Sequence, residues 1–166
     1  MAGNEKTNGK IKNINEICMI ITELKKKGKK IITTNGCFDI LHIGHSNYLQ
    51  EAKKLGDVLI VGVNTDSSVK ENKGDKRPVN SENARAGLIA SLGCVDYVFL
   101  FPEKDPRNFL QKIKPNIHVK GADRKIDQII EKNVVEENGG KVVLIPIVDD
   151  TSTTSLINKI IEVYKH

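Results

Sequence analysis

The chain has 166 residues, which is enough for one domain with a full hydrophobic core. Hydrophobic residues make up 39% and aromatic residues only 4%, with no Trp, which argues against a stacking platform for single-stranded nucleic acid. The net charge of +5 favours anionic substrates, although a solvated lysine-rich surface also explains it.

The three cysteines are widely spaced and form no Cys-x-x-Cys pair, which fits a reducing cytosol and provides no metal cage. No apolar run reaches the length of a membrane span, and no signal peptide precedes the domain. We therefore expect a cytoplasmic protein that binds neither membrane nor nucleic acid.

Residues 1–12 are polar and predict a disordered tail, so the single domain is expected over residues 13–166. In chain order the expected elements are a helix at 14–27, a strand at 30–35, a helix at 46–55, a strand at 58–64, a helix from Ser81 to near Gly93, a strand at 95–101, a helix at 105–114, a strand at 116–120, a helix at 126–137, a strand at 141–145 and a helix at 153–164. Residues 65–80 are polar and lysine-rich and predict a loop with at most one helical turn.

Strands alternate with helices, which predicts right-handed crossovers and an α/β fold: a Rossmann-like, doubly wound, five-stranded parallel sheet. The expected strand order is 3-2-1-4-5, with the site at the carboxyl ends of the strands. The last helix has Leu156, Ile157, Ile160 and Ile161 at helical spacing, and we expect that face to point inward.

Residues 34–45 carry the most distinctive chemistry. His42 and His45 flank Gly44 where a helix begins, and Gly36 ends the strand before them. Such a strand–loop–helix junction directs backbone N–H groups and the positive end of a helix dipole at one point, which suits an anion. A tight turn with incidental histidines is the alternative. The order resembles the nucleotidyltransferase superfamily, with its His-x-Gly-His after the first strand, and also the class I aminoacyl-tRNA synthetases that share this core.

Two further segments follow strands. Lys120, Gly121 and Asp123 come after the fourth strand, and residues 150–154 open the last helix with hydroxyl side chains. Hydroxyls there act as a helix cap or as part of a second anion site. Beside the histidine segment, the anion site is favoured. Neither Gly-x-Gly-x-x-Gly nor a P-loop occurs, so nicotinamide binding is not expected.

Residues from about 30 to 160 resemble the adenylyltransferase domain of bacterial heptose biosynthesis enzymes. The matching segments are Asn-Gly-Cys-Phe-Asp-Ile-Leu-His-Ile-Gly-His (35–45), Leu-Gly-Asp-Val-Leu-Ile-Val-Gly-Val-Asn-Thr-Asp (55–66), Lys-Gly-Asp-Lys-Arg-Pro-Val-Asn (73–80), Val-Lys-Gly-Ala-Asp (119–123) and Ser-Thr-Thr-Ser (152–155). The block at 73–80 makes this subfamily more specific than the histidine motif alone. The chain departs from the pattern at Ala122, where the family often has Gly, and 166 residues leave no room for the sugar kinase often fused to this domain.

The resemblance implies transfer of AMP from ATP to D-glycero-β-D-manno-heptose 1-phosphate, with release of pyrophosphate, for lipopolysaccharide or surface-polysaccharide precursors. It implies Mg²⁺ accompanying ATP, a separate kinase and a homo-oligomer. The catalytic residues it implies are His42, His45 and Lys73. The nucleotide-binding residues are Gly36, Cys37, Phe38, Gly44, Lys120, Gly121, Asp123, Ser152, Thr153 and Thr154. The expected substrate-binding residues are Asp39, Asn64, Lys70, Arg77 and Arg85, with Asp39 or Asp123 contacting ribose or Mg²⁺.

Three alternatives remain. The first is a cytidylyltransferase or other adenylyltransferase with a different phosphorylated acceptor. The second is a nucleotide-binding regulatory module without turnover, and the third is a basic RNA-binding protein. A synthetase is not expected, because the chain has no Lys-Met-Ser-Lys-Ser and no room for a tRNA-binding domain.

Overall fold

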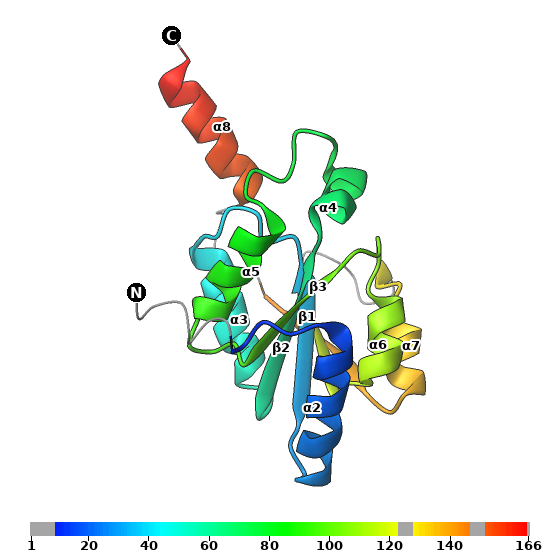
Figure 1. Ribbon diagram of the computed structural model, residues 1–166. Coiled ribbons are helices and arrows are strands. Elements are labelled where there is room, and N and C mark those ends of the chain that lie inside the picture. The colour runs from blue at the N-terminus through cyan, green and yellow to red at the C-terminus, as the bar shows by residue number, and fades with distance from the viewer. Residues whose placement is uncertain (1–8, 123–127, 147–151, 166) are drawn as a thin grey trace.

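The computed structural model describes residues 9–122, 128–146 and 152–165. Its centre is a five-stranded sheet in the order β3-β2-β1-β4-β5, with every pairing parallel (Figure 1). The strands are β1 (Ile31–Gly36), β2 (Val58–Asn64), β3 (Tyr97–Phe101), β4 (Ile117–Gly121) and β5 (Lys141–Ile145). The predicted strand order and doubly wound fold are confirmed.

Helices cover both faces of the sheet, so the strands need apolar residues on both sides. On one face, α3 (Ile43–Lys53) and α5 (Glu82–Ser91) pack through residues such as Leu49 and Ile89. On the other face lie α2 (Ile14–Lys26), α6 (Arg107–Ile113) and α7 (Lys132–Glu137). The inner strand β2, between β3 and β1, is buried along its whole length, which explains its continuous apolar sequence.

Two segments differ from the sequence prediction. Residues 65–80 contain a regular helix, α4 (Asp66–Lys73), which the polar sequence hid because it has little apolar periodicity; the Thr65 hydroxyl caps it by accepting from the Ser68 N–H. The helix predicted from residue 126 begins as α7 at Lys132, and residues 123–127 lie outside the described part.

The expected tail boundary at residue 12 is also too late. The backbone N–H of Lys12 donates to the carbonyl of Val98 at 2.9 Å, and the Val98 N–H donates to the carbonyl of Lys10 at 2.9 Å. These bonds attach residues 10–12 to the exposed edge of β3, so the folded domain begins before residue 13.

The prediction that α8 (Thr153–Tyr164) packs inward is wrong for its second half. Ile160 is 53% and Ile161 is 51% exposed, whereas Leu156 and Ile157 are half-buried. Figure 1 shows α8 leaving the domain from the carboxyl-end side of the sheet and projecting away from it. Periodicity identified an amphipathic helix but not what its apolar face contacts. Among the described residues no helix is long and apolar enough to span a membrane.

Candidate active site

A cavity of about 930 Å³ opens at the carboxyl ends of the parallel strands, where doubly wound folds place their sites. Residues from distant parts of the sequence meet there, because β1, β2 and β4 all end at this edge. Fifteen of the predicted residues line it: Gly36, Cys37, Phe38, Asp39, His42, Gly44, His45, Asn64, Lys73, Arg77, Lys120, Gly121, Ser152, Thr153 and Thr154. Lys70 and Arg85 are absent from the lining, and Asp123 lies outside the described residues.

The loop after β1 turns sharply beneath the cavity. Phe38 has a φ of 47°, a left-handed conformation that is uncommon for a bulky residue and marks a constrained position. Gly36 makes this turn possible, because a Cβ on Gly36 would lie 3.1 Å from the Phe38 ring. Phe38 is buried and directs the chain toward the start of α3.

The two motif histidines lie against each other at the start of α3. Their ring centroids are 3.8 Å apart with an interplanar angle of 29°, and the Phe38 ring meets His45 edge-on at 5.3 Å. Burial, with a smaller contribution from His42, lowers the pKa of His45 to about 4. His45 is therefore neutral at pH 7, and any hydrogen bond it gives comes from a neutral imidazole N–H.

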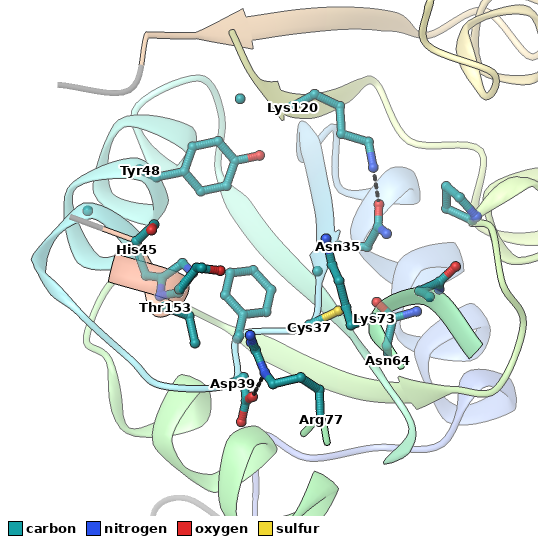
Figure 2. A pocket seen from close by; sticks show the side chains of 18 of the residues that line it. Asn35, Cys37, Asp39, His45, Tyr48, Asn64, Lys73, Arg77, Lys120 and Thr153 are labelled. Atoms are coloured by element: carbon teal, nitrogen blue, oxygen red, sulfur yellow. Dashed lines mark hydrogen bonds and ion pairs between the residues drawn. The ribbon is translucent and has the colours of Figure 1, made fainter. Parts of the chain in front are cut away.

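Two helices begin beside these rings. His42 is the N-cap residue of α3 but its side chain makes no capping bond, so the first turn of that helix is not capped by a side chain. Ser152 caps α8: its hydroxyl accepts from the Ser155 N–H, and the Ser155 hydroxyl accepts from the Ser152 N–H. Thr153 lines the same cavity as His45, and its hydroxyl donates to the carbonyl of Ile40, in the loop before α3, at 3.4 Å (Figure 2). The residues His42, His45, Ser152, Thr153 and Thr154 are called the histidine side of the cavity below.

The carboxylate of Asp39 is used within the protein. It is 1% exposed, pairs with the Arg77 guanidinium and accepts from the backbone N–H groups of Val79 and Asn80 (Figure 2). Burial alone would raise the pKa of Asp39, but the bonds from Asn80, Val79 and Arg77 outweigh it and lower the pKa. In the structure this carboxylate therefore anchors residues 77–80. The sequence analysis had expected it, or Asp123, to contact ribose or Mg²⁺.

Arg85 is likewise committed to the fold. It is fully buried on α5, and its guanidinium donates to the carbonyls of Asn80 and Cys37 at 3.0 and 2.6 Å and to Asp66 at 2.8 Å. Every guanidinium nitrogen has a protein partner, so Arg85 ties the motif loop to α4 instead of holding a substrate anion. Asp39, Arg77, Arg85 and Asp66 are called the Asp39 cluster below.

The two predicted lysines of α4 differ in placement. Lys73 lines the cavity, is exposed, and forms no ion pair within the described residues. Lys70 is exposed on α4 away from the cavity lining. Asn64 lines the cavity but is 4% exposed and donates to the Ser68 hydroxyl at 2.9 Å, which holds the start of α4 against β2. Lys73 is thus the lysine of this helix that is placed to reach a ligand.

On the opposite side of the cavity the sequence predicted Lys120 but missed Asn35, Tyr48 and Glu131. Asn35 and Lys120 lie one residue before the ends of the neighbouring strands β1 and β4, and the Lys120 ammonium donates to the Asn35 amide oxygen at 2.7 Å (Figure 2). The Tyr48 hydroxyl donates to the Val119 carbonyl at 2.9 Å. Glu131, just before α7, also lines the cavity. Asn35 was detectable, because polar residues that end adjacent parallel strands meet at one edge; nothing in the sequence marks Glu131.

No cluster of three or more His, Cys, Asp or Glu side chains suited to a metal ion occurs within residues 9–122, 128–146 and 152–165. A Mg²⁺ ion brought by a nucleotide keeps several waters and is held largely by phosphate oxygens, so this donor set is compatible with it. Cys37 lines the cavity, and burial raises the pKa of its thiol, so it is not a ready nucleophile.

The chain is similar to a known protein family over most of its length. The model of the family described as cytidylyltransferase-like matches residues 33–159. This chain belongs to that cytidylyltransferase-like family. The match covers β1 through most of α8 and so contains all the described residues of the cavity. The family membership confirms the nucleotidyltransferase resemblance and makes the chain a nucleotidyltransferase enzyme.

Relatives within the family are more specific. The bifunctional protein HldE of Geobacter metallireducens is 48% identical over 158 residues, covering 95% of this chain and 32% of that protein. HldE of Nitratiruptor sp. is 50% identical over 149 residues, covering 90% of this chain and 31% of that protein. This cytidylyltransferase-like chain spans about a third of the length of the curated relatives it matches.

Solved structures agree with the fold. The lipopolysaccharide core biosynthesis protein from Thermoplasma volcanium has a TM-score of 0.62 and 37% identity, covering 75% of this chain and 100% of that one. A pantoate-beta-alanine ligase from Francisella tularensis has a TM-score of 0.62 at 21% identity, covering 94% of this chain and 79% of that one, and shows the fold alone.

Proposed function

We propose that this enzyme transfers AMP from ATP to D-glycero-β-D-manno-heptose 1-phosphate, giving ADP-heptose and pyrophosphate for lipopolysaccharide or surface-polysaccharide synthesis. The observation that carries the proposal is the histidine side of the cavity, where stacked His42 and His45 lie beside the starts of α3 and α8. The similarity to HldE and to a lipopolysaccharide core biosynthesis protein supports the choice of substrate.

The histidine side suits a polyphosphate. Helix N-termini present N–H groups and a positive partial charge to anions, and hydroxyl and imidazole donors add directional bonds. Lys73 supplies a mobile positive charge from α4. In the proposed complex, His42, His45 and Lys73 contact the reacting phosphates, and Ser152, Thr153 and Thr154 contact the β- and γ-phosphates.

The reaction needs little acid–base chemistry. An oxygen of the acceptor phosphate forms a bond to the α-phosphorus of ATP while the bond from that phosphorus to the α–β bridging oxygen breaks, and pyrophosphate leaves with the electron pair. Because the acceptor oxygen is already anionic, the protein acts by aligning the two phosphates and stabilising the charge that develops.

His45 fits a donor more closely than a proton carrier. Its pKa of about 4 keeps the ring neutral near pH 7. Its buried Nδ1 has no hydrogen-bond partner among the described residues. A neutral imidazole held by stacking gives one N–H of fixed direction, which is what transition-state stabilisation by a preorganised donor requires.

The test is release of pyrophosphate, measured with each of four nucleoside triphosphates and Mg²⁺ against a panel of sugar 1-phosphates. We expect turnover with ATP and the heptose 1-phosphate, and loss of turnover in His45→Asn. Gln50→Ala, on the exposed face of α3, is the control.

The family description favours one competing outcome, a cytidylyltransferase. Equal or faster turnover with CTP would replace ATP as the donor and leave the phosphate chemistry intact. Turnover with ATP but only with a different phosphorylated acceptor would overturn the heptose assignment. Nucleotide binding without pyrophosphate release on any acceptor would overturn the enzymatic proposal.

A further inference from the structure

A chain of polar side chains runs from inside the sheet to the cavity. Thr33 and Asn35, two residues apart on β1, lie on the face of the sheet that α7 covers. His118 and Lys120 on β4 lie on the same face, because Thr33 pairs with His118 across the two strands. The Thr33 hydroxyl lies 2.9 Å from His118 Nδ1. On the far side of the ring, His118 Nε2 lies 3.6 Å from Glu131 Oε1.

Glu131 is the central member of this chain. It is 3% exposed, and its Oε1 lies 2.6 Å from the Lys120 ammonium nitrogen. Burial alone would raise the pKa of Glu131, but His118 and Lys120 outweigh it and lower the pKa to about 2. Burial lowers the pKa of His118 to about 4, so its ring is neutral at pH 7. Glu131 is thus an anion, and Lys120 is the lysine with which it forms an ion pair within residues 9–122, 128–146 and 152–165.

Lys120 is consequently held from two directions. Its ammonium lies between Glu131 Oε1 at 2.6 Å and Asn35 Oδ1 at 2.7 Å, and Lys120, Asn35 and Glu131 all line the cavity. A lysine on a flexible four-carbon stem normally samples many positions, whereas an ion pair with Glu131 and a hydrogen bond to Asn35 restrict this one. The His118 ring lies behind the Glu131 carboxylate at 3.6 Å, too far for a hydrogen bond, and limits the space into which the carboxylate can move.

We propose that Glu131 is a positioning residue for nucleotide binding: it holds the Lys120 ammonium at one place on the cavity floor, with His118 and Thr33 supporting it from inside the sheet. This inference rests on the proposed ATP-binding function. It gives a carboxylate of the cavity lining a role in placing a cation, whereas the Asp39 carboxylate in the same lining anchors residues 77–80. A donor fixed before binding loses less conformational freedom when the nucleotide arrives, so ATP binds more tightly.

The experiment measures the Kd of Mg·ATP by calorimetry and kcat and KM in turnover, for the full chain and for Glu131→Gln, Lys120→Met and the double variant. Glu131→Gln keeps the shape of the side chain and removes its charge. We expect the Kd and KM for ATP to rise about tenfold with kcat within about threefold, the scale of one charge-assisted hydrogen bond. Glu136→Gln removes the same charge from the exposed face of α7 and is the control.

The double variant separates positioning from direct contact or general stabilisation. If Glu131 acts through Lys120, then adding Glu131→Gln to Lys120→Met costs no further ATP affinity. An equal loss in both backgrounds would overturn the proposal, as would an unchanged Kd in Glu131→Gln alone.

A variant that retains the charge guards against misfolding. Glu131→Asp shortens the side chain by one methylene, and we expect a smaller rise in the Kd than with Glu131→Gln; an equal or larger rise would contradict the charge-based role. Thermal unfolding checks that each variant is folded. Failure of the unaltered chain to bind any nucleotide would overturn the proposed function itself, whereas binding that is indifferent to Glu131 would overturn only this inference.

Discussion

The Asp39 cluster and the histidine side of the cavity use their charged and polar groups differently. In the Asp39 cluster, the carboxylates and guanidinium groups of Asp39, Arg77 and Arg85 are bonded to one another and to backbone groups. On the histidine side, the stacked rings of His42 and His45, of which the His45 ring is neutral at pH 7, and the starts of α3 and α8 line the cavity. The difference separates residues that form the frame of the site from residues placed to meet a ligand, although Asp39 and the two histidines come from the same loop–helix segment.

The largest expected effect breaks the frame. Asp39→Ala removes the buried carboxylate that pairs with Arg77 and accepts from Val79 and Asn80, leaving a partly buried guanidinium and two N–H groups without it. We expect the free energy of unfolding, measured in urea, to fall by about 3–5 kcal/mol. Asp75→Ala, an exposed position in the same segment, is the control and should change it by less than about 0.5 kcal/mol. A fully stable Asp39→Ala variant with weakened substrate binding would instead return Asp39 to the ligand.

The opposite pattern is expected on the histidine side. His42→Asn and His45→Asn should each lower kcat by about 10²–10³-fold, the scale of losing one transition-state donor. The free energy of unfolding should change by less than about 1 kcal/mol, because neither ring belongs to the main hydrophobic clusters. Steady-state turnover and urea unfolding, measured on the same samples, check both halves. Unchanged kcat in either variant would mean that the ring does not contact the reacting phosphates.

The sequence predicts the strands and the position of the cavity, but not the bonds of the Asp39 cluster. Buried β-branched runs such as Val58–Asn64, alternating with helical periodicity, were enough to predict all five strands and their order. The motif also located the cavity, because strand ends meet at one edge. The bonds between Asp39 and Val79 and between Arg85 and Cys37 join residues 40 and 48 positions apart, and the sequence does not reveal which distant partner a charged side chain will meet.

Other elements escaped the sequence for different reasons. α4 has a polar sequence with one buried apolar residue, Val69, and it is also held by the Thr65 cap and the bond from Asn64 to Ser68. α8 has a clear apolar face, but Ile160 and Ile161 are exposed, since periodicity does not say whether a surface is covered. Glu131 looks like an ordinary surface residue of a helical segment until the fold brings it to Lys120.

A third prediction sharpens the comparison within one helix. Lys73 and Lys70 lie one turn apart on α4, but only Lys73 lines the cavity. We expect Lys73→Ala to lower kcat/KM for ATP about tenfold, equivalent to about 1.4 kcal/mol, and Lys70→Ala to change it less than twofold. Each substitution removes the same charge from the same helix, so Lys70→Ala is the matched control. Equal effects would indicate that α4 acts only through its overall charge.

The smallest expected effect is the contribution of His45 to the pH dependence of the free energy of unfolding. The pKa of His45 is about 4 in the folded chain against 6.5 for an ordinary histidine, because burial and His42 disfavour its charged form. Between these values the unfolded chain binds the additional proton, so the free energy of unfolding rises with pH and is lost as the pH falls from about 6.5 to about 4. One proton contributes at most about 1.4 kcal/mol per pH unit. Since water reaches part of the His45 ring, we expect a total nearer about 1 kcal/mol.

His45→Asn removes this contribution while leaving the others in place. Acid also destabilises the unaltered protein and the His45→Asn variant alike through other groups. These groups are His118, whose pKa is lowered to about 4, and Glu131 and Asp39, whose pKa values are also lowered. Urea unfolding at intervals from pH 7 to pH 4 should therefore give curves that converge as the pH falls, with the shallower slope in His45→Asn. Parallel curves would mean that His45 titrates alike in the folded and unfolded chains. Its ring would then be protonated near pH 6, and the neutral-donor account of the histidine side would have to give way to a cationic one.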